Sequence, residues 1–338
     1  MSIVKVAALA GVSKSTVSRV INHVPGVGEP LRQRVMKAMK ELDYQPSPRR
    51  PGPKPASRRG VKSGNVLLLV AGFEASAVYR LPIFPDILHG IETALAEAGM
   101  NLVMAGLRDE GPLPASLSPE QCDGVLMMGT YERLNPAVRR ALATIPTIVL
   151  LRTFEQFAGP YDRVLYNNRS VGPMAAKHLL SLGHVHAAFL NSDPKHQAFE
   201  QRRQMFTEAM TAAGGRVVDL AIDPTSRTPQ HQVDLQIKIL KQASPAVTCL
   251  CASSDHVLSY VYPALRGQGL EPQKDIEIIS CDNNQAVISV IDPKPSTIDI
   301  RAEAIGRLAI RQLRWRLANP NEEGPVAVSV EPKLIVAG

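Results

Sequence analysis

Residues 6–22, with the sequence VAALAGVSKSTVSRVIN, decide the fold of the amino-terminal part of this 338-residue chain. Apolar side chains recur at helical spacing up to Ala10, and Gly11 then permits a tight turn. Ser13 is a natural N-cap for a second helix, which we expect to end near Ile21. The stretch therefore predicts two short helices joined by a sharp turn.

A third helix is predicted from about Pro30 to Leu42. Proline is tolerated at the first position of a helix, and apolar residues recur through this segment. Three short helices of this kind form a helix-turn-helix, whose second helix fits the major groove of DNA. We therefore expect an all-α DNA-binding domain over residues 1–46.

The positive charge of the chain is concentrated at its amino end. Residues 1–63 hold 13 Lys or Arg against 3 Asp or Glu, a local charge of +10. The remainder carries −3, so the net charge of +7 describes a basic head on a nearly neutral body. Because each cation that meets a phosphate releases counterions, this asymmetry indicates a polyanionic partner.

The sequence gives no sign of export or of membrane insertion. Its start lacks the apolar stretch and cleavage pattern of a signal peptide, and the most apolar run, residues 66–73, is too short to cross a bilayer. The cysteines lack the spacing of metal ligands and lie in apolar runs, so we expect buried free thiols in a reducing cytoplasm: Cys122, Cys249, Cys251 and Cys281.

Residues 6–22, together with RQRVMKAMKELDYQP at 32–46, closely resemble the headpiece of the lactose-repressor family of transcriptional regulators. The resemblance implies that Lys14 and Ser15 read bases and that Arg19 reaches a guanine edge. It also implies phosphate contacts that fix the register, from Ser13, Thr16, Ser18 and Asn22. For Thr16 and Ser18 the alternative is simple solvation on a helix surface.

Residues 47–64 depart from this resemblance. Relatives form a short helix here on DNA and insert a leucine into the minor groove, but the prolines of this stretch forbid a regular helix, and Pro53 stands at the leucine position. In one hypothesis Arg49 and Arg50 lie in a narrow minor groove on an extended strand, similar to an AT-hook although its Gly-Arg-Pro core is absent. In the other, the segment is a flexible tether that adds only nonspecific affinity.

From Asn65 onward, apolar strand-like runs alternate with amphipathic helices, and the alternation restarts after Tyr166. This pattern predicts two successive α/β lobes with doubly wound parallel sheets and a ligand cleft at the carboxyl ends of the strands. The same order resembles the periplasmic-binding-protein-like core of the family, although we expect the relatives' helix near 108–122 to be truncated or replaced by a loop. We expect a ligand-binding and dimerisation core over 65–338, with a first lobe of about 65–162 plus 296–318 and a second of about 163–292 plus 325–338.

The resemblance also implies which second-lobe residues bind an effector. Asp255, otherwise only an N-cap, stands where an acid hydrogen-bonds ligand hydroxyls. Arg202 stands where an arginine grips the ligand, the alternative being a surface salt bridge. Asp282 either faces the cleft or caps a turn. Asn167 is the first residue of an Asn-Asn pair where relatives have Asp-Asn, so one charge is lost there.

In the first lobe, Phe84 and Asp86 lie where family contacts to the ligand arise, although Phe84 fits a core position equally well. Carboxylates, amides and an arginine with one stacking ring suit a polyol, which favours a sugar effector. Purine-sensing relatives use similar parts.

No catalytic motif, cofactor motif or metal-ligand pattern stands out, so we expect no enzyme. The favoured function is a cytoplasmic, homodimeric regulator, a repressor whose grip on a near-palindromic operator in double-stranded DNA is controlled by a small effector. Two alternatives remain, a solute-binding protein of the periplasmic type and a regulator that has lost effector sensing. The direction of the response is not readable from the sequence.

Overall fold

The computed structural model describes residues 3–21, 27–42, 44, 61–71, 82–107, 112–129, 134–153, 155–223, 225 and 228–337. The chain divides into two compact units, Met1–Arg58 and Arg59–Gly338, and each is described by itself. The predicted contact residues Asn22, Arg49 and Arg50 lie outside the described residues.

The first unit contains the three expected helices, α1 (Ile3–Ala10), α2 (Lys14–Ile21) and α3 (Glu29–Glu41). The Ser13 hydroxyl accepts the N–H of Thr16 at 3.1 Å, which confirms Ser13 as the N-cap of α2. Gly11 makes the turn in the left-handed region, with φ +63°. The helices share a small core that is closed by the buried side chains of Val6, Ala7, Ala10, Val17, Val20, Val35 and Ala38.

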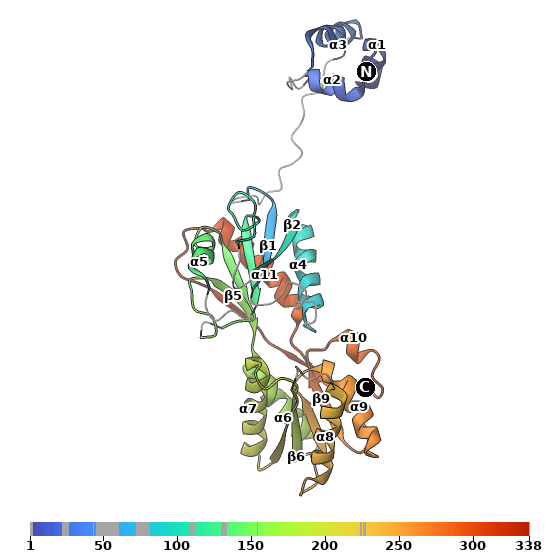
Figure 1. Ribbon diagram of the computed structural model, residues 1–338, viewed down its shortest axis with the longest axis vertical. Coiled ribbons are helices and arrows are strands. Elements are labelled where there is room, and N and C mark those ends of the chain that lie inside the picture. The colour runs from blue at the N-terminus through green and yellow to red at the C-terminus, as the bar shows by residue number, and fades with distance from the viewer. Residues whose placement is uncertain are drawn as a thin grey trace. The chain divides into compact units, whose positions relative to one another are not determined.

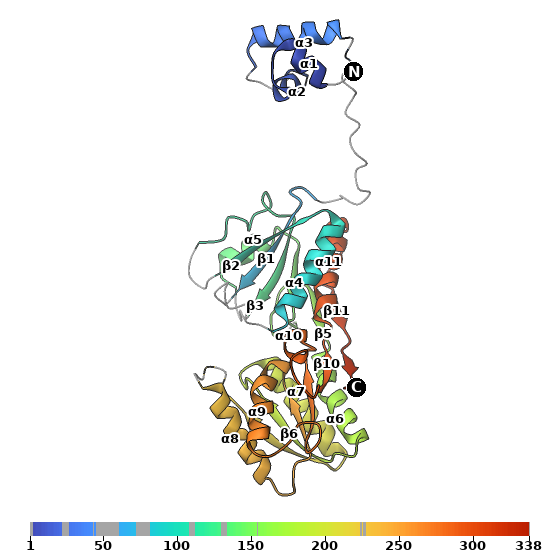
Figure 2. The same cartoon turned by 90° about the vertical axis from the view of Figure 1, so that its right-hand side faces the viewer.

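The second unit has two six-stranded sheets (Figures 1 and 2). The first has the order β11-β5-β4-β3-β1-β2 and is parallel throughout. Its strands are β1 (Asn65–Ala71), β2 (Asn101–Leu107), β3 (Gly124–Gly129), β4 (Thr147–Leu150), β5 (Asp162–Tyr166) and β11 (Ala327–Val330).

The second sheet has the order β12-β10-β9-β8-β6-β7, and its pairings are parallel except for the antiparallel edge strand β12. Its strands are β6 (His186–Asn191), β7 (Arg216–Ala221), β8 (Cys249–Ala252), β9 (Glu277–Cys281), β10 (Ser296–Asp299) and β12 (Lys333–Ile335). The predicted doubly wound α/β architecture is confirmed by these two sheets and the helices that cover them.

Helices cover both faces of each sheet. In the first lobe these are α4 (Phe84–Ala98), α5 (Pro136–Leu142) and α11 (Ala302–Ala318). In the second lobe they are α6 (Val171–Ser181), α7 (Gln197–Ala212), α8 (Pro229–Gln242), α9 (Leu258–Gly267) and the short α10 (Gln285–Ile288), with 3₁₀ turns η2 (Asn168–Ser170) and η3 (Asp255–Val257). The described part of the segment expected to lack a helix, residues 112–122, contains turns and bends only.

Two glycines allow α4 and α11 to pack against each other closely, as Figure 2 shows. A Cβ atom on Gly90 would collide with the backbone oxygen of Glu303, and one on Gly306 would collide with that of Ile87. Both helices cover the face of the first sheet to which Leu68 contributes, whereas α5 covers the opposite face.

The sheets correct the expected lobe boundaries. β5 and β11 belong to the first sheet, and β10 belongs to the second. The chain therefore crosses between the lobes at Asn167, at residues 300–301 and at residues 331–332, so residues 163–166 and 327–330 belong to the first lobe and residues 296–299 to the second. Short strands next to a crossover can join either sheet, and only long-range pairing decides which.

All four cysteines are buried and free, as predicted. Among the described residues, no helix has the length and apolar character needed to cross a membrane.

Candidate functional site

The recognition helix α2 presents its predicted contact residues to solvent. Ser13, Lys14, Ser15 and Arg19 are exposed and Thr16 and Ser18 are partly exposed, whereas Val17 and Val20 are buried. The Ser13 hydroxyl lies 2.7 Å from that of Ser15 and 2.9 Å from that of Thr16, so three hydroxyls gather at the start of α2. A helix start carries partial positive charge and unpaired N–H groups, which suits a phosphate oxygen.

The second predicted site lies where strands of the second sheet end, beside the crossovers to the first lobe. At its centre is Arg202 of α7, whose side chain is only 3% exposed. Its Nη2 donates to Asp282 Oδ1 at 3.1 Å and to the hydroxyl of Tyr166 at 2.8 Å. Its Nε donates to Asn168 Oδ1 at 2.9 Å, and its Nη1 donates to the backbone oxygen of Ser253.

The Arg202–Tyr166 contact joins the two lobes. Tyr166 ends β5 of the first sheet, whereas Arg202 belongs to α7 of the second lobe. Burial raises the pKa of Tyr166 to about 12, so its hydroxyl stays neutral and donates or accepts a hydrogen bond. The guanidinium carbon of Arg202 also lies 5.3 Å from the centre of the Phe199 ring.

Asp282 has a strained backbone at this point. It directly follows β9 and has φ +108°, a region that L-residues rarely adopt. Its Oδ2 accepts a hydrogen bond from the Ser254 hydroxyl, and its side chain is 5% exposed. Such strain persists where the surrounding structure enforces it, and it concentrates at functional sites.

Asp255, the acid predicted to hydrogen-bond ligand hydroxyls, is bound by groups of its own lobe. It is fully buried, and its Oδ1 accepts from the hydroxyls of Ser280 and Thr297. Its Oδ2 accepts from the backbone N–H of Asn284 at 2.7 Å. The side chain of Asn284 in turn donates to the backbone oxygen of Pro82 in the first lobe at 2.7 Å. Asp255 therefore supports a loop that reaches the first lobe, and its carboxylate accepts three hydrogen bonds, whereas that of Asp282 accepts two.

The other three predicted contacts have different surroundings. Phe84 is 1% exposed and belongs to the core, in line with its alternative interpretation. Asp86 is exposed to solvent on one side at the start of α4; partial desolvation by its neighbours, followed by the negative charges of Asp299 and Glu303, raises its pKa. Asn167 donates to the Glu331 carboxylate at 3.1 and 3.2 Å, which links two crossovers.

The structure adds Tyr166, Asn168, Ser254 and Phe199 to the surroundings of Arg202. Tyr166 and Ser254 stand at or just after the carboxyl end of a strand, and the rule that ligands bind there could have singled them out. Their direct contact partners could not be derived from local sequence. Among the described residues, no three His, Cys, Asp or Glu side chains are arranged to hold a metal ion.

A basic helix-turn-helix unit and a two-lobed α/β unit define a DNA-binding transcriptional regulator. Residues 2–47 match the family described as bacterial regulatory proteins, lacI family, and residues 176–337 match the periplasmic binding protein-like domain. The chain therefore combines a headpiece of the lacI family of bacterial regulatory proteins with a periplasmic binding protein-like domain.

Relatives match along nearly the whole chain. The ribose operon repressor of Haemophilus influenzae is 27% identical over 341 residues, covering 98% of this chain and 96% of the relative. The HTH-type transcriptional regulator CelR of Thermobifida fusca is 28% identical over 339 residues, with the same coverage.

Solved structures share the fold. The complex of the transcriptional regulator CelR with cellobiose has a TM-score of 0.67 and 26% identity, covering 100% of both chains. The lac repressor dimer bound to operator and the anti-inducer ONPF has a TM-score of 0.64 and 18% identity, covering 99% of this chain and 97% of that one.

Proposed function

We propose that this chain is a repressor whose affinity for operator DNA is controlled by a sugar bound beside Arg202 and Asp282. The observation that carries the proposal is the buried Arg202–Asp282 pair at the crossovers, contacted by Tyr166 from the other lobe. A guanidinium and a carboxylate side by side offer donors and acceptors for neighbouring hydroxyls. The similarity to a regulator solved with cellobiose supports a saccharide.

Each second-lobe residue has a distinct part in this proposal. Asp282 and Arg202 bind ligand hydroxyls, and the half-buried ring of Phe199 offers an apolar face to the sugar ring. Asp255 acts as a positioning residue, since its oxygens are held by Ser280, Thr297 and Asn284. Asn167, Phe84 and Asp86 are not assigned to the ligand.

The control mechanism follows from the contact between the lobes. A ligand can shift an equilibrium only if it binds the two lobe arrangements with different free energies. A hydroxyl of the sugar would compete with the Tyr166 hydroxyl for Arg202, so ligand occupancy and the interlobe contact are linked. We propose that this change in lobe arrangement alters the linker, residues 47–64, which leads into β1.

On DNA, we propose that two headpieces of a homodimer read the half-sites of a near-palindromic operator in the cytoplasm. Lys14, Ser15 and Arg19 read base edges, while Ser13, Thr16 and Ser18 hold phosphates. Arg49 and Arg50 remain proposed minor-groove contacts. If Arg49 and Arg50 lie in the minor groove, changing both to Ala should lower the DNA affinity more for operators with A·T-rich flanks than for operators with G·C-rich flanks. An equal loss on both operators would favour the flexible tether.

Titration calorimetry of the full-length protein with mono- and disaccharides, cellobiose and ribose included, tests the ligand proposal. Asp282→Asn should abolish sugar binding, whereas Asp275→Asn, an exposed acid seven residues earlier, should leave it unchanged. If the protein binds nucleosides but no sugar, the proposed ligand class is wrong and the ligand is a nucleoside. Binding of sugars that is indifferent to Asp282→Asn would refute the site.

A further inference from the structure

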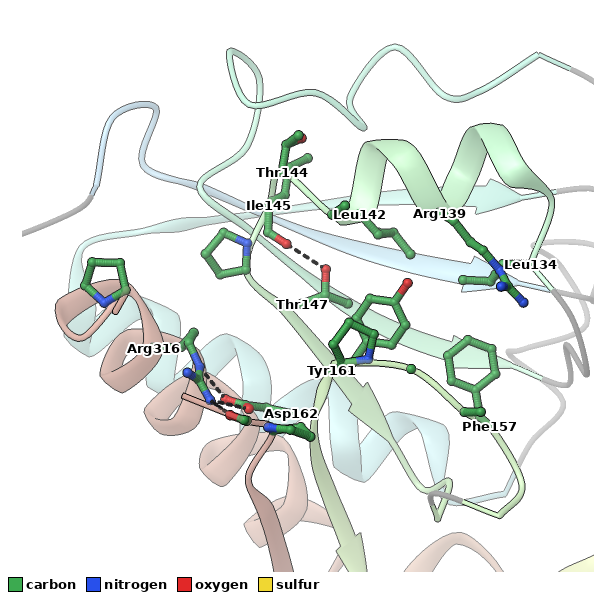
Figure 3. Close-up of a pocket in the computed structure, with 18 of the residues that line it drawn as sticks. Leu134, Arg139, Leu142, Thr144, Ile145, Thr147, Phe157, Tyr161, Asp162 and Arg316 are labelled. Carbon is green, nitrogen blue, oxygen red and sulfur yellow. Dashed lines mark hydrogen bonds and ion pairs between the residues drawn. The ribbon is translucent and has the colours of Figure 1, made fainter. Parts of the chain in front are cut away.

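The first lobe contains a concavity at the opposite end of its sheet from Tyr166. It has a volume of about 900 Å³ and lies beside the first residues of β4 and β5, the end of α11 and the loop before β11. Figure 3 shows α5 above it and the Arg316–Asp162 pair at one end. This volume lies in the range of small-molecule sites, about 300–1,000 Å³.

The floor and walls of this concavity are largely apolar. The rings of Phe157 and Tyr161 are stacked, with centroids 5.9 Å apart and an interplanar angle of 27°. Leu134, Leu142 and Ile145 supply aliphatic walls. An apolar lining of this kind suits a flat or aliphatic ligand body, since burying it removes apolar surface from water.

At its aromatic end the concavity carries a positive charge, that of Arg139. Arg139 is exposed on α5, lines the concavity and makes no ion pair within the part of the chain that the structure describes. Its charge reaches Tyr161, where it opposes the rise in pKa that burial causes. A guanidinium beside a phenol hydroxyl can pair with a carboxylate through two parallel hydrogen bonds.

The carboxylate of Asp162 does not repel such an anion, because it is already compensated. Arg316 donates to its two oxygens at 2.6 and 3.0 Å, and Gln312 and the backbone N–H of Val326 add bonds of 2.8 and 2.9 Å. Glu322 also lines the cavity, beside Arg316, whose Nη1 bonds to its backbone oxygen. Figure 3 shows the Arg316–Asp162 pair at the end of the concavity away from Phe157 and Arg139.

We propose that this concavity binds a small organic anion with an aromatic or aliphatic body, distinct from the sugar site. Its apolar part would lie on Phe157 and Tyr161, and its carboxylate or similar group would pair with Arg139. The occupant adjoins the base of the linker, since a neighbouring cavity of about 210 Å³ shares Arg316 and is also lined by Lys62.

Fluorescence titration of the full-length protein with 8-anilinonaphthalene-1-sulfonate, an aryl sulfonate, tests the proposal. Arg139→Ala should weaken binding of this probe by about tenfold, the effect expected for one charged hydrogen-bonded pair. Arg140→Ala is the matched control, because Arg140 is also exposed on α5 but does not line the cavity. It should change the affinity by less than about twofold.

A second variant tests the same surface without removing a side chain. Ala143→Glu places a negative charge at an exposed lining position and should also weaken the probe. Equal probe affinity in the wild type, Arg139→Ala and Ala143→Glu overturns the proposal, as does displacement of the probe by saturating sugar. If both variants instead change the sedimentation behaviour and leave the probe unaffected, the surface is a contact between copies and the proposal fails. Apart from the competition with sugar, these readouts do not depend on sugar or DNA binding by the protein.

Discussion

Asp123 Oδ2 accepts the backbone N–H of Gly64 at 2.6 Å and so ties the start of the body to the first sheet. Its other oxygen accepts the N–H groups of Lys62 and Ser63 at 2.5 and 2.9 Å. Asp123 is buried and directly precedes β3, while Gly64 directly precedes β1. One carboxylate thus binds three successive residues at the base of the linker.

Asp123→Asn should weaken both the fold and the coupling. An amide can accept with only one oxygen, so at least one backbone N–H loses a charged acceptor, and the free energy of unfolding should fall by about 1–3 kcal/mol. The ratio of operator affinities with and without effector should move towards one, while sugar affinity stays unchanged. Denaturant unfolding and operator titrations measure both, with the nearby exposed Glu120→Gln as control. An unchanged ratio would show that this carboxylate serves stability alone.

Tyr166→Phe removes the hydroxyl that reaches Arg202 across the lobes. We expect a stability loss of about 1 kcal/mol, typical of one hydrogen bond, and a clear change in sugar affinity, because the competing partner of Arg202 is gone. Titration calorimetry measures the sugar affinity and thermal unfolding measures the stability. Both are compared with the control variant Tyr260→Phe, which changes a tyrosine on α9. Sugar affinity that is equal in the two variants would mean that Tyr166 plays no part in ligand control.

Asp255 should make the body less stable as pH rises. Burial, followed by the charge of Asp282, raises the pKa of Asp255 to about 7, well above the ordinary value of 3.8 for an aspartate. The native state therefore holds a proton that the unfolded state releases, so this contribution is fully present at low pH and is lost as pH rises through the raised pKa. Asp255→Asn should flatten the fall in unfolding free energy between pH 4 and 8, whereas the exposed Asp275→Asn should retain it. A slope unchanged by Asp255→Asn would place the titration elsewhere.

Gly90→Ala should destabilise the first lobe, because the new Cβ meets the backbone oxygen of Glu303. Forcing α4 and α11 apart should cost about 1–3 kcal/mol. Gly267→Ala is the control, since a Cβ at this glycine in α9 meets nothing within 4 Å. It should leave stability unchanged or raise it by up to about 1 kcal/mol, in line with helix propensity. Thermal unfolding compares the melting temperatures of the two variants. Equal melting temperatures would contradict the close packing of α4 and α11.

Local sequence was enough for the headpiece and for most element positions. Ser13 lies before an amphipathic run, and the structure shows it capping α2. The sequence did not predict which sheet each short strand joins. β10, for example, is a short strand, and a loop and a helix separate it from its partner β9. The role of Asp255 was hidden for the same reason. The sequence shows that Asp255 follows a strand. It does not show that Ser280 and Thr297, whose hydroxyls donate to Asp255 Oδ1, come from two other strands.

The central claim is that the exposed second helix of a basic headpiece reads base edges in duplex DNA. The most direct measurement is the affinity of the wild type and Arg19→Ala for a selected operator and its single-base variants, over a series of salt concentrations. The account predicts wild-type affinity that falls steeply with salt, and a loss of about 1–3 kcal/mol in Arg19→Ala together with relaxed preference at one base pair. Wild-type protein that binds no duplex more tightly than another, or an Arg19→Ala variant with undiminished preference at every position, would contradict it.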